Sequence, residues 1–95
     1  MNSPYSDSRF TVELNLDAGN DLMAAYLAYF PSMQGHRVTK AEQIFMYLLS
    51  DDPERNGIHL TDGLYHLVVS PLRVAYEIHP ANQIVVVTSI GFFPV

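Results

Sequence analysis

A single arginine, Arg73, stands near the start of an otherwise apolar run in SPLRVAYEIHPANQIVVVTSIG, residues 70–91, and the chain has only five lysines and arginines in 95 residues. A guanidinium binds phosphate oxygens and stabilises developing negative charge. A histidine imidazole, with a pKa of about 6.5 in water, transfers protons near neutral pH, and His66 lies shortly before this run. RNA cleavage by 2′-hydroxyl attack needs such a cation with an acid and a base in reach. Arg73 and His66 are therefore the candidate catalytic residues.

The spacing of these residues predicts that they share one face of a sheet. If residues 70 and 71 form a two-residue turn, Val68 pairs with Arg73 and His66 pairs with Ala75 across antiparallel strands. Side chains alternate along a strand, so a solvated face would carry four polar residues: His66, Arg73, Glu77 and His79. The opposite face would pack against helices and carry Leu67, Val69, Leu72, Val74, Tyr76 and Ile78. Glu77 and His79 are accordingly candidate binding residues.

A second interpretation of the same residues requires no function. Arg73 would pair with Glu77 on its own strand, and His66 would be an ordinary exposed residue. Such a pair contributes roughly 0.2–1 kcal/mol. A carboxylate beside a phosphate site would also repel the substrate, so both interpretations stay open at this point.

The histidines raise the question of a metal site. His59, His66 and His79 could approach one another at the sheet, but they show no HxH or HxxxH spacing and no accompanying carboxylate at ligand spacing. We therefore predict no metal site and no cofactor.

The segment GFFPV contains two adjacent phenylalanines, Phe92 and Phe93. In an extended chain they project to opposite faces, so at least one is exposed unless something covers it. They are candidate binding residues for a second copy of the chain, as a homodimer, or for a segment of another protein. The alternative is that a helix or the N-terminal leader with Tyr5 covers them.

The elements that must position these residues follow from hydrophobic periodicity. Apolar residues alternate with polar ones from Phe10 to Leu16, as in a half-buried strand. A helix is predicted from Asp17 or Asn20, either of which could cap it, to residue 30 before Pro31. A second helix is predicted from a capping box at Thr39 and Glu42, with an apolar stripe of Ala41, Ile44, Phe45 and Leu48.

Three strands follow over residues 64–70, 71–78 and 83–90, and their short connections predict an antiparallel meander. The predicted order is β-α-α-β-β-β. We expect an α+β fold in which two helices pack on one face of a small, mostly antiparallel sheet.

Length and composition bound the remaining possibilities. Ninety-five residues suit one domain, here residues 10–95 after a flexible leader, residues 1–9. There is no cysteine, no basic-then-apolar signal segment and no apolar run near the roughly 20 residues of a membrane span. We expect a soluble cytoplasmic protein with no membrane contact. The net charge of −5 argues against a general phosphate-binding surface.

The order of elements, together with LSDDPERNGIHLTDGLYHLVVSPLRVAYEIHPANQIVVVTSIG, resembles the RelE/ParE superfamily of type II toxin-antitoxin toxins. The resemblance spans residues 10–91 and is most specific over residues 52–91. It implies a toxin that is held by a cognate antitoxin and acts either as a ribosome-dependent mRNA endoribonuclease or on DNA gyrase. An antitoxin chain wrapped around the toxin would bury Phe92 and Phe93.

The resemblance also implies a role for Arg73, which matches the arginine that contacts the scissile phosphate in RNA-cutting members. Those members carry lysines and arginines on the preceding strand, where this chain has His66, Val68 and Ser70, and a basic stretch after the last strand, where this chain has GFFPV. The leading expectation is an endoribonuclease with a reduced basic site. The alternative is a non-catalytic binding module on the same scaffold, either a gyrase-directed inhibitor or a protein-interaction domain.

Overall fold

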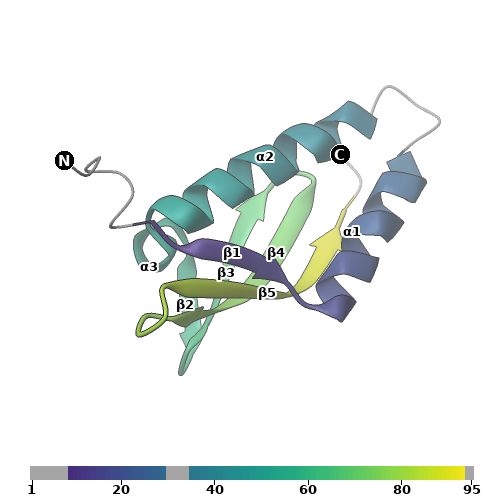
Figure 1. Cartoon of the computed structure of the whole chain (residues 1–95). Helices are drawn as coiled ribbons and strands as arrows, with labels where there is room; N and C mark the ends of the chain where they lie inside the picture. Colours follow the sequence, from purple (N-terminus) through teal and green to yellow (C-terminus); the bar gives the residue numbers. More distant parts are fainter. Residues whose placement is uncertain (1–8, 30–34, 94–95) are drawn as a thin grey trace.

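Five strands form one sheet in the order β1-β5-β4-β3-β2 in the computed structural model, which describes residues 9–29 and 35–93 (Figure 1). The strands are β1 (Thr11–Leu14), β2 (Ile58–Thr61), β3 (Leu64–Val69), β4 (Leu72–His79) and β5 (Ile84–Phe92). Strands β2 to β5 are an antiparallel meander, whereas β1 pairs parallel with β5. The sheet is therefore mostly antiparallel, as predicted.

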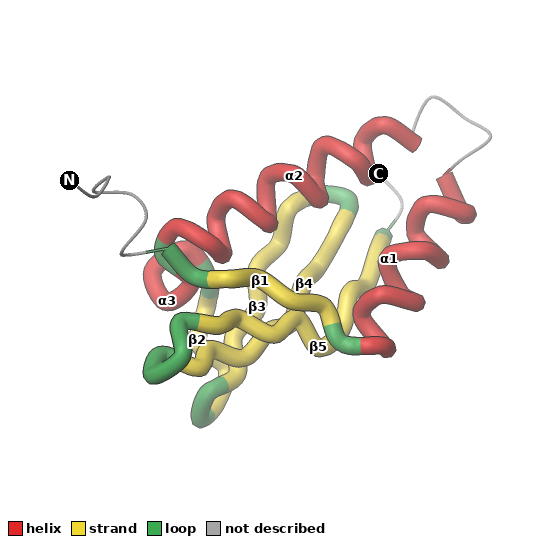
Figure 2. Tube along the Cα trace, viewed as in Figure 1, coloured by secondary structure: helices red, strands yellow, loops and turns green. Residues whose placement is uncertain are grey.

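Three helices accompany the sheet: α1 (Leu16–Tyr29), α2 (Gly35–Asp51) and the one-turn α3 (Pro53–Asn56). Figures 1 and 2 show α1 and α2 on the same side of the sheet. The Tyr26 hydroxyl of α1 donates a hydrogen bond to Glu42 Oε1 of α2 at 2.5 Å and so joins the two helices. The predicted α+β fold, with two helices on one face, is confirmed.

The core lies between these helices and the inner face of the sheet. Its members are apolar residues with little or no exposed surface: Ala18, Leu22, Ala25, Val38, Ala41, Phe45, Leu49, Leu72, Val74, Tyr76, Val85, Val87 and Ile90. The pairing of β3 with β4 matches the predicted register, with Val68 opposite Arg73 and His66 opposite Ala75. This register places the apolar alternate residues of β4 toward the helices.

Both predicted helix starts are wrong. Asn15 ends β1 by donating its backbone N–H to the Val87 carbonyl at 3.0 Å, and its side-chain Oδ1 accepts from Ala18 N at 2.8 Å. Asn15, rather than Asp17 or Asn20, therefore caps α1, and Leu16 leaves the strand to begin the helix. Helix α2 begins at Gly35, so Thr39 lies inside it rather than at a capping box.

Two short elements were not predicted. Helix α3 begins at Pro53 and is capped by Asp52, whose Oδ1 accepts from Arg55 N at 3.2 Å. Strand β2 is exposed along its whole length, and the alternation of apolar and polar residues in its sequence, IHLT, is only four residues long. The turn at residues 62–63 lies where expected, and Gly63 adopts the positive φ of 73° that glycine tolerates best.

The predicted flexible leader, residues 1–9, lies outside the described residues except for Arg9, whose guanidinium is 5.7 Å from the ring centroid of Tyr47. Within the described part of the chain, no helix has both the length and the apolar character needed to span a membrane.

Candidate functional site

The face of the sheet opposite α1 and α2 carries the two candidate catalytic residues and the two polar candidate binding residues. Arg73, Glu77 and His79 of β4 are exposed there, and His66 of β3 is half-buried. His66 lies opposite Ala75 while Arg73 lies opposite Val68, so His66 and Arg73 are diagonal neighbours. Diagonal Cβ atoms in an antiparallel pair are roughly 7–8 Å apart. Both side chains are thus within reach of one small ligand on this outer face.

Arg73 lies beside a shallow hollow of about 90 Å³ that is lined by Arg73, Gly91, Phe92 and Phe93. Gly91 is paired with Arg73 across β4 and β5, and without a side chain it leaves the surface beside the guanidinium open. The Arg73 guanidinium carbon lies 5.8 Å from the ring centroid of Phe93, a cation–π distance. The backbone N–H of Phe93 donates to the Pro71 carbonyl at 3.1 Å, which holds the ring at this place.

The two adjacent phenylalanines take different sides of the sheet. Phe92 pairs with Leu72, whose side chain is in the core, yet 41% of Phe92 is exposed. Phe93 lies on the outer side with Arg73. We call the group formed by His66, Arg73 and Phe93 the arginine corner.

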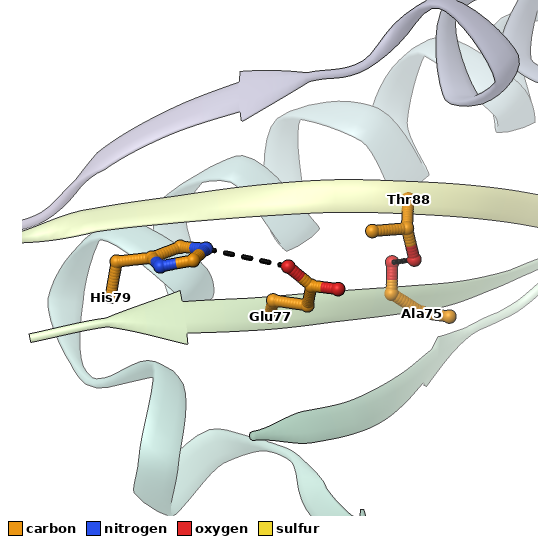
Figure 3. A network of polar contacts seen from close by, with 4 residues as sticks. All are labelled: Ala75, Glu77, His79 and Thr88. Atoms are coloured by element: carbon orange, nitrogen blue, oxygen red, sulfur yellow. Dashed lines mark hydrogen bonds and ion pairs between the residues drawn. The ribbon is translucent and has the colours of Figure 1, made fainter. Parts of the chain in front are cut away.

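Glu77 and His79 form a separate pair farther along β4. His79 Nε2 lies 3.4 Å from Glu77 Oε1, and Figure 3 shows the two side chains directed toward each other. In the same view the Thr88 hydroxyl donates to the Ala75 carbonyl at 3.3 Å, next to the bulge that interrupts the pairing of β4 with β5. Among the described residues Glu77 is thus paired with His79 and not with Arg73.

Distance also separates this acidic pair from the arginine corner. Four residues of extended chain span roughly 13 Å, and Arg73 and Glu77 are four residues apart on β4. That distance exceeds the screening length of about 8–10 Å for exposed charges near physiological salt. The repulsion that a carboxylate would exert on a phosphate at Arg73 is therefore weak.

The histidines do not gather into a metal site. His59 is paired with Tyr65 on the side of the sheet opposite to His66, with ring centroids 5.0 Å apart. His79 belongs to the far pair on β4. Among residues 9–29 and 35–93, no three histidine, cysteine, aspartate or glutamate side chains lie close enough together to hold a metal ion.

Sequence reasoning missed a group of basic residues at the turn between β3 and β4. A pocket of about 140 Å³ is lined there by His36, Arg37, Lys40, Ala41, Ile44 and Ser70. Arg37, Lys40 and Arg73 are three of the chain's five lysines and arginines, and they flank the same turn from the helix side and the outer side. The spacing of Arg37 and Lys40 is visible in the sequence, but their proximity to Ser70 depends on how α2 packs.

Tyr76 fixes the position of β4 against the rest of the fold. Its side chain is fully buried, and its hydroxyl donates to the Pro53 carbonyl at 2.6 Å. Its ring stacks on Tyr65 with centroids 5.7 Å apart. Burial raises the pKa of Tyr76 to about 12, and Tyr65 and Asp52 add to the effect. The strand that carries Arg73 is therefore anchored from its inner face.

Comparison with known proteins gives likeness in structure alone. No protein-family model and no curated protein matches the sequence. A chain of the toxin-antitoxin complex RelBE2 from Mycobacterium tuberculosis superposes with a TM-score of 0.74 at 19% identity, over 93% of this chain and 95% of that chain. A chain of the chromosomal ParDE system from P. aeruginosa superposes with a TM-score of 0.65 at 15% identity, over 93% of this chain and 100% of that chain. A mutant of E. coli toxin RelE in the free state superposes with a TM-score of 0.62 at 15% identity, over 88% of this chain and 83% of that chain.

These three solved structures cover between 88% and 93% of this chain. They agree with the resemblance that the sequence of residues 10–91 indicates. The chain has the RelE/ParE toxin fold.

Proposed function

We propose that this chain is the toxin of a toxin-antitoxin pair and cleaves RNA at the arginine corner. The observation that carries the proposal is the placement of Arg73 on the face of the sheet opposite α1 and α2, where it is exposed, 5.8 Å from the Phe93 ring and diagonal to His66. A cation, an aromatic ring and an imidazole on one open surface are complementary to a phosphate, a base and a ribose hydroxyl.

Each side chain has a distinct task in this mechanism. Arg73 binds the non-bridging oxygens of the scissile phosphate and stabilises the charge that develops on them. The Phe93 ring offers a face on which a base stacks. His66 either accepts the 2′-hydroxyl proton as that oxygen attacks phosphorus or donates a proton to the departing 5′-oxygen. The corner offers one imidazole for two proton transfers, so the second falls to water or, in ribosome-dependent cleavage, to a group of the ribosome.

The basic pocket beside the turn supports this proposal. Arg37 and Lys40 approach Ser70 from α2, three residues before Arg73 in the chain. Backbone phosphates on either side of the cleaved bond would be neutralised by these cations, and each such contact makes binding weaker at higher salt. The cations that are missing from β3 are thus replaced by cations from a helix.

An antitoxin is the partner that we propose for this chain. Two of the solved structures with this fold come from a toxin-antitoxin complex and a toxin-antitoxin system. The same face of the sheet also exposes apolar surface beside the corner, since half of Val68 is exposed. A partner that covers Val68 and Phe93 would block Arg73 directly.

The test is expression of the chain without a partner in a bacterial host. We expect growth arrest and mRNA cleavage on translating ribosomes, and we expect Arg73→Ala and His66→Ala to relieve both. Arg55→Ala is the matched control, because Arg55 is an exposed arginine on α3. Cleavage by Arg73→Ala at the wild-type rate would contradict the assignment.

A second candidate, a non-catalytic inhibitor of a protein such as gyrase, is favoured by the acidic half of the same face. Glu13 of β1 and Glu77 of β4 lie on either side of Val86, a placement that suits a basic protein surface better than RNA. For this candidate, growth arrest would persist in His66→Ala without mRNA cleavage. Charge reversal at Glu13 and Glu77 would then relieve the arrest.

A further inference from the structure

Helix α1 has an apolar seam on the side that faces solvent. Leu16, Met23 and Leu27 are 79%, 63% and 69% exposed, and Asn20 between them is also exposed. These four residues are separated by four, three and four positions, which is the spacing of a helix-packing seam. The opposite side of α1 is buried in the core through Ala18, Leu22 and Ala25. A helix that is apolar on both sides is normally packed on both sides.

We propose that this seam joins two copies of the chain, with their α1 helices antiparallel. The four-three-four spacing reads the same in both directions, so a two-fold rotation superposes the seam on itself. Leu16 then packs against Leu27 of the second copy, and Asn20 packs against Met23 of the second copy. Ala24 beside the seam is small and exposed, and it lets the two helix backbones approach closely.

The charges of α1 favour this occupant and this direction. The helix carries Asp17 and Asp21 and no lysine or arginine. The Asp21 carboxylate is directed to β5, where it accepts from Ile90 N at 2.9 Å, so the seam itself is uncharged. Two copies can therefore meet along it without burying a charge in the contact. A parallel pair would bring the two Asp17 residues together at one end, whereas an antiparallel pair puts them at opposite ends.

The size of the contact predicts a weak dimer. The 14 residues of α1 span about 21 Å at 1.5 Å per residue. One helix pair of this length buries less than the roughly 800 Å² per partner of a standard interface. We therefore expect monomers and dimers in exchange at about 10 µM to 1 mM protein, where a dimer of this strength is partly populated.

A charge swap tests both the contact and its direction by sedimentation equilibrium. The average mass of the wild-type protein should rise toward twice the monomer mass across this concentration range. Leu16→Lys and Leu27→Glu should each remain monomeric, because each buries an unpaired charge. The double variant should regain dimers, because residue 16 of each copy then faces residue 27 of the other with opposite charge.

Two controls complete the experiment. Ile58→Glu changes a residue of similar exposure, 62%, on β2 and should dimerise like wild type. Circular dichroism of all variants should be unchanged, because the seam lies outside the core. Wild-type protein that stays monomeric at about 1 mM overturns the proposal. A double variant that stays monomeric while the wild type dimerises overturns the antiparallel arrangement.

Discussion

The two ends of the β3–β4 pair are built in opposite ways. At the turn end, which comprises Arg73, Phe93 and the basic pocket, the side chains of Arg73 and Lys40 are exposed to solvent. At the α3 end, the Tyr76 hydroxyl is buried and bonded to Pro53 within the fold. Polar groups that are buried and hydrogen-bonded within the fold stabilise it, whereas exposed charged groups are accessible for binding. The comparison predicts that substitutions at the α3 end cost stability and substitutions at the turn end cost function.

The largest effect is expected for Gly57→Ala at the α3 end. A Cβ at Gly57 would overlap the Tyr76 hydroxyl and lie 2.8 Å from Tyr76 Cζ, so the hydrogen bond to Pro53 could not form. The free energy of unfolding should fall by about 2–4 kcal/mol, as measured by urea denaturation. Tyr76→Phe in the same background should recover part of the loss, because it removes the overlapping oxygen. Gly19→Ala, where no atom lies within 4 Å of the added carbon, should not destabilise α1.

The next effect is a loss of stability at alkaline pH. The pKa of Tyr76 is about 12 in the folded chain, whereas an unperturbed tyrosine has a pKa of about 10. The unfolded chain therefore releases the tyrosine proton first, and stability falls as pH rises from about 10 to about 12. The loss should amount to about 2–3 kcal/mol by denaturation at a series of pH values. Tyr76→Phe should flatten this part of the profile, and an equally steep profile in Tyr76→Phe would contradict the assignment.

A smaller effect is expected where α1 supports the turn end. Asp21→Ala removes the acceptor of Ile90 N and should lower the free energy of unfolding by about 1–2 kcal/mol. Asp17→Ala is the matched control. It removes an exposed acid from the first turn of the same helix and should cost about 0.3–1 kcal/mol through the helix dipole alone. Equal losses in both variants would show that the Asp21 carboxylate acts only as a charge.

The smallest effect on stability is expected for Arg73→Ala. The side chain is exposed and its cation–π contact with Phe93 contributes about 0.5–1 kcal/mol at such a site. The free energy of unfolding, measured by thermal denaturation, should fall by no more than this amount. RNA binding at low salt should weaken clearly. Arg73→Lys keeps the charge and should retain part of the binding. A large loss of stability in Arg73→Ala would mean that the turn end is structural after all.

Local patterns in the sequence predict the centre of the sheet well. The short turn at residues 70 and 71 sets the register of β3 with β4, and alternation along β4 separates Arg73 from Tyr76. The element ends depend on contacts from distant residues. Asn15 caps α1 while it is bonded to Val87, and no local rule distinguishes it from Asp17. Strand β2 is exposed throughout, and its alternation of apolar and polar residues covers only four positions, the shortest run that indicates a strand.

The candidate site also has a part that local sequence patterns predict and a part that they do not. The short turn between β3 and β4 and the alternation of side chains along each strand are enough to place His66 and Arg73 on one face. The Phe93 ring reaches Arg73 because its backbone is bonded to Pro71, and Glu77 turns to His79 rather than to Arg73. Arg37 and Lys40 approach Ser70 only because α2 packs across the sheet. These contacts join separate elements or depend on side-chain direction, which periodicity does not determine.

The order of the strands has a consequence for the timing of synthesis. Strand β5 lies between β1 and β4, so the first strand of the sheet can be paired only after the last described strand has left the ribosome. Bacterial chains grow at about 5–20 residues per second, and during that time β1 and both long helices have no completed sheet to cover. Phe93 follows β5 directly and completes the arginine corner. A partly synthesised chain thus lacks the corner, and any activity there begins only when translation of the domain is almost finished.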